Sequence, residues 1–421
     1  MAHVAQPTSV VPGRSVLPAL ALGSFITTLT FAAPAPFLTD ISEDFAVGVP
    51  LLGQITAAML ILSAPLALVA GPLADRYGSR RLILLGLAAT TACLLVFGLA
   101  PVFPVLFLAS VAGAVSEATV PGLSLAIAGT RFKGASARRA LGWTIGALAS
   151  APIVGVPILT TIGDVAGWRV AFLAAGAAAI CIVVLVAVWL PEDGQRPDDA
   201  LRLHTIVDAY RPLIHDVAMR GLYACTILRS TCWFGLLTYL GALLRDRFLL
   251  STSEVGLVYM LAGSGYLLGS LVAGGPLARL PARPLVAVSN VTMGLLMMVA
   301  FSAILDTRLT VALLPFAGFA GAVGWVGLTA LLTSETRAGA GTTMVLNGSL
   351  FNLGAAAGAG IGGVLLATGG FNALAVGLPL FGLGSALCMG IRRSRVNDLP
   401  AGSVSTVKSD VLLGSGEESL T

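Results

Sequence analysis

The sequence predicts an all-α membrane protein with twelve transmembrane helices in two pseudo-symmetric halves of six. Three observations lead to this fold class. Of the 421 residues, 57% are hydrophobic and only 10% are charged, whereas soluble domains carry about 25% charged residues. Apolar runs of roughly twenty residues, long enough to cross about 30 Å of hydrocarbon as helices, recur along the chain. A short sequence also repeats at matching places in the two halves.

Twelve apolar runs meet the required length, and six fall in each half of the chain. The runs are 16–39, 48–73, 82–100, 103–129, 140–162, 170–190, 219–244, 254–278, 284–305, 309–333, 341–367 and 372–391. Pro101 and Pro104 separate the third run from the fourth, because proline interrupts a helix.

Arginine and lysine are distributed unevenly between alternate connections. Cytoplasmic loops of membrane proteins hold the excess of these residues. Basic clusters at 76–81, 131–139 and 392–395 lie on one expected side, and the other side holds only Arg169, Arg245, Arg247 and Arg308. The first loop on that second side carries only acidic residues, Asp40, Glu43 and Asp44. We therefore expect a multi-pass protein of the bacterial inner membrane with both termini in the cytoplasm.

These runs divide the chain into five expected segments. The segments are a cytoplasmic N-terminal segment 1–15, an N-terminal six-helix half 16–190, a cytoplasmic linker 191–218, a C-terminal six-helix half 219–393 and a tail 394–421. The first run is too long for the core of a signal peptide, so we expect it to be a retained span. The tail is rich in Ser, Gly and Glu, which predicts disorder.

The composition argues against several other classes of protein. All five cysteines lie inside apolar runs, so neither a metal site nor a disulfide framework is expected. The basic residues are scattered among short loops, which argues against a nucleic-acid partner. No Ser-His-Asp set or phosphate loop accompanies the spans, so we expect neither an enzyme nor a cofactor. The expected partners are the lipid bilayer, a small-molecule substrate and protons, and the chain is expected to be a monomer.

The repeat consists of four residues. Gly71-Pro72-Leu73-Ala74 ends the second run, and Gly275-Pro276-Leu277-Ala278 ends the eighth. An arginine and a basic turn follow in both places. The equivalent position in each half supports two related halves.

The segment from Gly71 to Arg81, GPLADRYGSRR, resembles the signature loop between the second and third helices of the major facilitator superfamily. Glycine permits a sharp turn and close approach of helices. The resemblance implies that this loop acts in gating, through Gly71, Asp75, Arg76, Gly78 and Arg80. The alternative is that the arginines serve only as charges that set the topology.

A second resemblance lies in the fifth run. Ala151-Pro152-Ile153-Val154-Gly155 is similar to the Gly-Pro-x-x-Gly kink of proton-driven exporters in this superfamily, although alanine replaces the first glycine. The similarity implies a helix kink at Pro152 and Gly155. It favours the twelve-span drug and metabolite proton antiporters.

Glu117 is the acidic residue that lies deep inside an expected span. A charge at mid-bilayer depth costs roughly 2.5–3.5 kcal/mol on insertion scales, so its presence indicates a function. Gly113 and Pro121 lie one helical turn to either side, and Ser110 and Ser124 lie two turns away. This small and polar stripe predicts that Glu117 faces a cavity and acts as the proton-coupling carboxylate.

Arg229 is the basic residue well inside a span, in the run 219–244. In the superfamily the first, fourth, seventh and tenth helices line the central cavity, and the resemblance implies that Glu117 and Arg229 face each other across the two halves. We expect Arg229 to bind the substrate or act as a counter-ion. A purely structural ion pair is the alternative.

Other residues are expected to bind the substrate beside Arg229. They are Thr27, Phe31, Trp233, Trp325 and Asn347. Polar residues in helical bundles often bond a neighbouring helix instead, so packing is the alternative for each.

The main hypothesis is a secondary active transporter that exports a small, partly hydrophobic drug or metabolite by proton antiport and alternating access. The alternative is an uptake symporter or facilitator for a small organic or inorganic anion, in which Arg229 pairs with the substrate.

Overall fold

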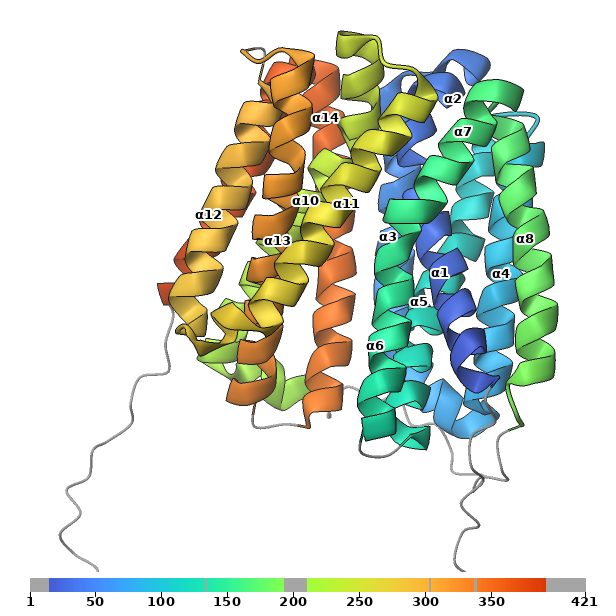
Figure 1. Cartoon of the computed structure of the whole chain (residues 1–421), viewed down its shortest axis with the longest axis vertical. Coiled ribbons are helices and arrows are strands. Elements are labelled where there is room, and N and C mark those ends of the chain that lie inside the picture. Colours follow the sequence, from blue (N-terminus) through green and yellow to red (C-terminus); the bar gives the residue numbers. More distant parts are fainter. Residues whose placement is uncertain (1–14, 133–134, 193–209, 303, 337–338, 391–421) are drawn as a thin grey trace, which may run out of the picture.

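The computed structural model describes residues 15–132, 135–192, 210–302, 304–336 and 339–390. The described residues form helices and no strand. Figure 1 shows these helices as two bundles side by side, the N-terminal half (α1–α8) and the C-terminal half (α10–α14). The expected N-terminal segment, most of the linker and the tail lie outside the described residues.

The N-terminal half follows the predicted order of spans. Its elements are α1 (Val16–Ala32), η1 (Ala35–Phe37), α2 (Leu38–Phe45), α3 (Val49–Tyr77), α4 (Ser79–Leu99), α5 (Pro104–Arg131), α6 (Ala135–Ser150), η2 (Ala151–Gly155), α7 (Val156–Ala166) and α8 (Trp168–Trp189). Helix α4 ends before Pro101 and α5 begins at Pro104, so the prolines separate these helices as the sequence predicts.

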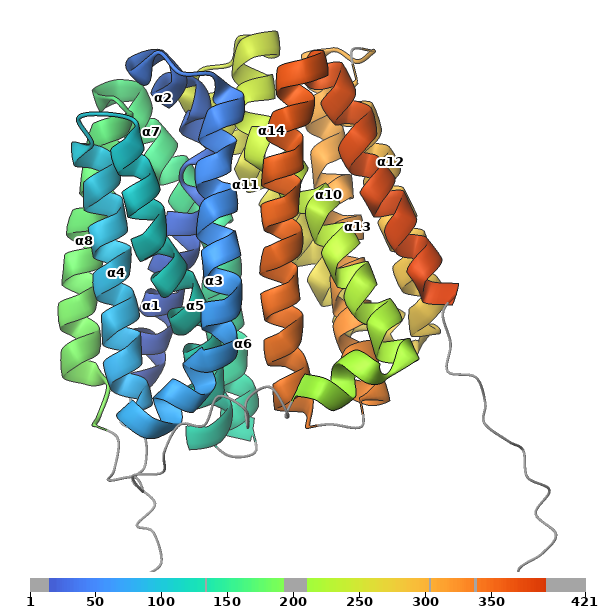
Figure 2. The ribbon, with the colours of Figure 1, turned by 180° about the vertical axis from the view of Figure 1, so that it is seen from behind.

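The C-terminal half ends in one long helical element that reverses direction. Its elements are α10 (Val217–Phe248), α11 (Thr252–Gly274), η3 (Pro276–Arg279), α12 (Ala282–Phe301), α13 (Thr307–Glu335), α14 (Ala340–Leu387) and η4 (Cys388–Gly390). At Gly370 the backbone leaves helical geometry, with φ 62° and ψ −160°. Figure 2 shows an orange and a red leg of α14 that meet near this reversal. Eleven described helical segments are long and apolar enough to cross a membrane, and the reversal makes twelve crossings.

The first apolar run is not one helix to residue 39. Helix α1 ends at Ala32, and the short η1 follows with Pro34 before it and Pro36 within it. Proline lacks the N–H that a continuing helix needs. Asp40, Glu43 and Asp44 consequently lie on helix α2 instead of in a loop. We call the end of the molecule that carries α2 the α2 end.

Apolar side chains cover the outside of both halves. Large residues that are more than half exposed occur on six different helices, namely Leu85, Leu108, Val188, Leu271, Val288 and Phe316. A soluble protein rarely exposes so wide an apolar surface. Lipid is the solvent that suits this surface, and helices satisfy their backbone hydrogen bonds within it.

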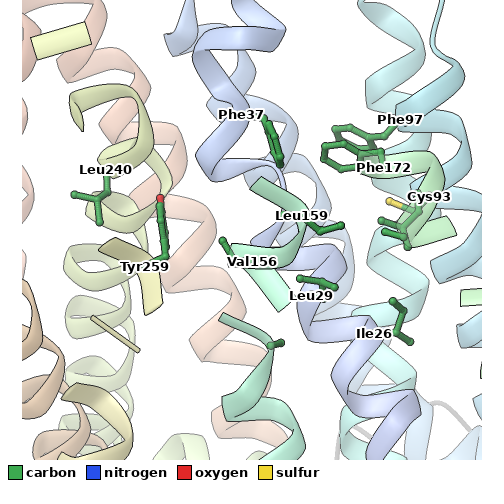
Figure 3. Close-up of a cluster of buried hydrophobic side chains, with 14 of the residues drawn as sticks. Ile26, Leu29, Phe37, Cys93, Phe97, Val156, Leu159, Phe172, Leu240 and Tyr259 are labelled. Atoms are coloured by element: carbon green, nitrogen blue, oxygen red, sulfur yellow. The ribbon is translucent and has the colours of Figure 1, made fainter. Parts of the chain in front are cut away.

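Aromatic rings hold the N-terminal half together near the α2 end. Phe97 on α4 and Phe172 on α8 stack with centroids 5.1 Å apart, and Phe37 of η1 lies 5.8 Å from Phe172. Figure 3 shows Phe97 and Phe172 on one side of Val156 and Leu159 of α7, with Tyr259 of α11 on the other side. Helix α7 therefore lies between the core of its own half and the C-terminal half.

The two halves approach most closely where glycine leaves room. A Cβ on Gly53 of α3 would collide with the Tyr239 hydroxyl of α10, and one on Gly241 would collide with the Ala35 carbonyl oxygen. A Cβ on Gly256 of α11 would collide with Thr160 of α7 in the same way. These contacts lie toward the α2 end.

Candidate transport site

Glu117 lies on the inner face of α5. The exposed residues Leu108, Val111 and Ala126 mark the outer face of this helix. At 100° per residue they lie about 120–180° around the helix from Glu117. The Glu117 side chain is partly buried, and it takes part in no hydrogen bond or ion pair with the rest of the described chain. A carboxylate at this position is only partly hydrated, and no charge of the described chain pairs with it. Its ionised form is therefore incompletely stabilised.

Hydroxyl groups hold α5 in place next to Glu117. The Thr90 hydroxyl of α4 lies 2.5 Å from the Ser116 hydroxyl of α5 and 3.3 Å from the Thr27 hydroxyl of α1. Ser116 and Thr27 lie 3.4 Å apart. All three side chains are buried. The structure thus places Thr27 in a bridge between three helices of its own half.

Arg229 is buried inside the C-terminal half. Its side chain is only 2% exposed. Nη2 donates to the Gly321 carbonyl oxygen of α13 at 2.5 Å, and Nε donates to Asn290 Oδ1 of α12 at 3.5 Å. The guanidinium carbon lies 5.3 Å from the centroid of the Trp325 ring. Each of these partners is electrically neutral.

Asn347 of α14 lies beside the same part of α10. Thr226, one turn before Arg229, donates to Asn347 Oδ1 at 2.7 Å. Asn347 is 1% exposed, and its Nδ2 is buried without an acceptor in the described chain. A buried amide donor without a partner is costly, so this group is available to a ligand or a water.

A row of aromatic rings runs from the N-terminal half toward Arg229. Phe31 of α1 lies 5.7 Å from Phe234 of α10, Phe234 lies 4.9 Å from Phe351 of α14, and Phe351 lies 5.3 Å from Trp325 of α13. All four rings are partly exposed. We call these four residues the ring row. Trp233, by contrast, is buried beside Tyr266 of α11 at 6.1 Å and lies outside this row.

Three of the residues that form the site were not among the predicted substrate ligands. Phe234 follows Trp233 directly, Phe351 lies one turn after Asn347, and Asn290 contacts Arg229 from α12. The sequence offers one signal for Phe351, since residues four apart share a helix face. For Phe234 and Asn290 the decisive contacts come from other helices.

Glu117 and Arg229 do not pair in this conformation. Among the described residues, no hydrogen bond or ion pair joins them, and Arg229 has no carboxylate partner. The structural ion pair, which was the alternative interpretation of these two residues, is therefore absent from the described part of the chain. Glu117 in the N-terminal half and Arg229 in the C-terminal half are thus inner charges of opposite sign.

The loop that resembles the superfamily signature lies at the end opposite α2. Gly78 has φ 94°, a conformation that favours glycine, and separates α3 from α4. Arg80 pairs with Glu192 at 2.8 Å and donates to the Ala187 carbonyl oxygen of α8 at 2.6 Å. Asp75 and Arg76 are exposed. The four-residue repeat differs between halves, because α3 continues through Gly71 to Tyr77 whereas α11 ends at Gly274.

Close helix approach does not explain Gly71. No heavy atom lies within 4 Å of the position that its Cβ would take. The expectation of close packing at this glycine was wrong. Gly71 lies within α3, and a side chain at this position would point into open space.

The segment around Pro152 and Gly155 adopts π-helical geometry, as η2, between α6 and α7. A Cβ on Gly155 would lie 2.8 Å from Leu29 of α1, and one on Gly263 of α11 would lie 2.9 Å from Ile153. The irregular turn thus contacts both halves. Such insertions are common causes of helix bends.

The comparison with known families decides the identity of the fold. The sequence profile described as the Major Facilitator Superfamily matches residues 20–248, more than half of the chain. The chain belongs to the major facilitator superfamily. This membership indicates membrane transport.

Relatives of this superfamily member agree with that assignment. It is 27% identical over 238 residues to the uncharacterized MFS-type transporter YceJ of Bacillus subtilis, a match that covers 56% of this chain and 60% of the relative. The chain therefore spans less than two thirds of the curated relative that it matches.

Solved structures share the superfamily fold. The human organic anion transporter MFSD10 is similar with a TM-score of 0.67 and 19% identity, covering 91% of this chain and all of that one. The xylose transporter XylE of E. coli, in a partially occluded inward open conformation, is similar with a TM-score of 0.69 and 14% identity, covering 89% and 96%.

Proposed function

We propose that this superfamily member is a proton-coupled antiporter that exports a small, partly hydrophobic compound across the inner membrane of a bacterium. The observation that carries the proposal is the inner carboxylate of Glu117, which has no partner in the described chain. A carboxylate that is transferred away from water gains proton affinity. Glu117 is therefore the group that binds and releases the coupled proton.

The arrangement of the halves supports alternating access. Close glycine contacts and an ion pair join them toward the α2 end, and hydrogen bonds from Ser349 and Asn352 of α14 to α3 join them farther from it. With both termini in the cytoplasm, as the arginine distribution predicts, the α2 end faces outward and the end that carries the 71–81 loop faces inward. Rocking of one half against the other then exposes the site to the outside. The 71–81 loop acts as the cytoplasmic gate in this scheme.

The proton gradient is large enough to drive export. One proton moving inward delivers roughly 2.3 kcal/mol per 100 mV of membrane potential and about 1.4 kcal/mol per pH unit. Together these sustain a substrate gradient on the order of several hundredfold.

Proton flux, measured across a panel of compounds, tests the proposal. The purified protein is reconstituted into liposomes that hold a pH-sensitive dye, and aromatic carboxylates, amines and neutral aromatics are added one compound at a time. We expect at least one compound to move protons in the opposite direction to itself, and protein-free liposomes to show no such movement. Compound transport that never changes the internal pH would contradict proton coupling.

A second function is favoured by the buried charge of Arg229, which no carboxylate of the described chain neutralises. In this alternative the protein is an uptake symporter or facilitator for a small anion, and the similar human structure, an organic anion transporter, supports it. The two functions differ in the sign of proton release. Adding substrate to the protein in weakly buffered detergent releases protons from an antiporter but not from a symporter.

A further inference from the structure

Arg229 is a buried cation with an incomplete set of partners. A carbonyl oxygen, an amide oxygen and the face of an indole contact it, and no carboxylate of the described chain does. Neutral dipoles compensate a buried charge only in part, and proteins normally supply a counter-charge. The surroundings of Arg229 are therefore suited to an anion that comes from outside the chain.

A second buried donor, Asn347 Nδ2, belongs to a side chain that bonds Thr226, one turn before Arg229 on α10. Thr226 donates a hydrogen bond to Asn347 Oδ1, and this bond fixes the orientation of the amide. Asn347 Nδ2 is buried and has no acceptor among the described residues. Thr226 and Arg229 are three residues apart on α10, so they share a helix face. A carboxylate has two oxygens that accept several hydrogen bonds, and it can bind a guanidinium and an amide together.

The ring row defines the rest of the ligand. It begins at Trp325, directly over the Arg229 guanidinium, and continues through Phe351 and Phe234 to Phe31. The rings are partly exposed and meet in tilted or edge-to-face pairs, an arrangement in which another flat ring finds offset or edge contacts. The ligand thus has an acceptor at one end and an aromatic body at the other.

We infer that the transported compound is an aromatic monocarboxylate. Its carboxylate binds Arg229 and Asn347 Nδ2 in place of the Trp325 indole face, and its ring lies against Phe351 and Phe234. This inference rests on the proposed function, since it takes this site to be the place where the transported compound binds.

Other ligand classes fit the same residues less well. Arg229 repels an organic cation, and a sugar would leave most of its hydroxyl groups against the ring row. A phosphate dianion would keep one charge unpaired, because Arg229 is the one basic residue at the middle of a described helix. The single positive charge of Arg229 matches the single negative charge of a monocarboxylate.

Binding of benzoate and two close analogues tests the ligand class. Affinities are measured by titration calorimetry on the full-length protein in lipid nanodiscs, with no gradient present. Benzamide keeps the ring and loses the charge, and cyclohexanecarboxylate keeps the charge and loses the aromatic face. We expect benzoate to bind about tenfold more tightly than benzamide, because hydrogen bonds to an ionised acceptor are the stronger ones. Equal affinity for benzoate and benzamide would overturn the inference.

Variants of Arg229 and Asn347 test whether these residues determine the affinity for benzoate. Arg229→Gln is expected to weaken benzoate binding about tenfold or more, and the matched control Arg308→Gln, on the exposed start of α13, is expected to leave it unchanged. Asn347→Asp replaces the proposed amide donor with a carboxylate, which repels the benzoate carboxylate, and should abolish benzoate binding. It provides a second test if Arg229→Gln fails to fold. Unaltered benzoate affinity in either folded variant would contradict the site.

Trp325 provides an independent optical readout. If the carboxylate replaces the indole face, benzoate changes the fluorescence of the wild type, and Trp325→Phe loses this change. Trp143→Phe, on the exposed surface of α6, should keep it. A response that survives in Trp325→Phe would contradict the replacement.

The binding and proton measurements distinguish failure of the proposed ligand class from failure of the antiport proposal. If benzoate does not bind but another compound still moves protons, the ligand class is wrong and the antiport proposal stands. If benzoate binds and crosses the bilayer without moving protons, the ligand class stands and the antiport proposal is wrong.

Discussion

Asp40 on α2 and Arg245 on α10 form an ion pair of 2.7 Å that joins the two halves at the α2 end. Thr252 of α11 donates to the second oxygen of Asp40 at 3.2 Å, and Thr39 donates to Asp246 at 3.1 Å. Ser253 of α11 donates to Asp164 of α7 at 2.8 Å. Polar contacts therefore accompany the close glycine contacts at the end that is closed in this conformation.

The ion pair between Asp40 and Arg245 should stabilise this closed end by a modest amount. Both side chains are about one-fifth exposed, and such pairs contribute about 1 kcal/mol or less. We expect Asp40→Asn and Arg245→Gln to lower the free energy of unfolding in detergent, and the double variant to lose less than the sum of the two. Additive losses in this double-mutant cycle would show that the pair is not coupled.

Gly53 and Gly71 should respond oppositely to alanine although both lie on α3. A Cβ at Gly53 meets the Tyr239 hydroxyl, whereas a Cβ at Gly71 meets open space. Gly53→Ala should therefore separate α3 from α10 and lower the unfolding temperature. Gly71→Ala should leave it unchanged or raise it, since alanine stabilises a helix interior by up to about 1 kcal/mol relative to glycine. The reverse order in a thermal unfolding assay would show that the close approach at Tyr239 is misplaced.

Thr27→Val separates a bracing role from a substrate-binding role. Thr27 bonds Thr90 and Ser116 inside its own half, and hydrogen bonds between membrane helices contribute about 0.6 kcal/mol on average. We expect a small loss of stability and no change in the affinity for the transported compound. The control Thr333→Val removes an exposed hydroxyl that bonds only its own helix backbone. Weaker binding of the compound by Thr27→Val would instead place Thr27 in the binding site.

Hydropathy was sufficient to predict the order of the membrane-spanning segments and, approximately, their number. Each apolar run is long enough to cross the hydrocarbon layer as a helix, and a helix satisfies its backbone hydrogen bonds within that layer. Few other structures are therefore open to such runs. The ends of the helices were less predictable, because capping and proline act locally. Pro34 and Pro36 divide the first run, and η2 introduces a π-helical turn that no apolar pattern reveals.

The charges of the site could be predicted and their neighbours could not. Glu117 and Arg229 are conspicuous, because a charge in a long apolar run is rare. The contact between Arg229 and Trp325, by contrast, joins residues on α10 and α13 that are 96 positions apart. The ring row likewise draws its members from four helices, and nothing in their spacing along the chain brings them together.

Measuring exchange and gradient-driven accumulation separately tests the role of Glu117 most directly. Liposomes that contain Glu117→Gln are compared with wild type and with Glu43→Gln, an exposed acidic residue of α2, using the compound that moves most protons. Without a gradient, we expect all three proteins to exchange labelled for unlabelled compound. With an imposed pH gradient, wild type and Glu43→Gln should accumulate the compound, and Glu117→Gln should not. Accumulation by Glu117→Gln at the wild-type level would contradict the account.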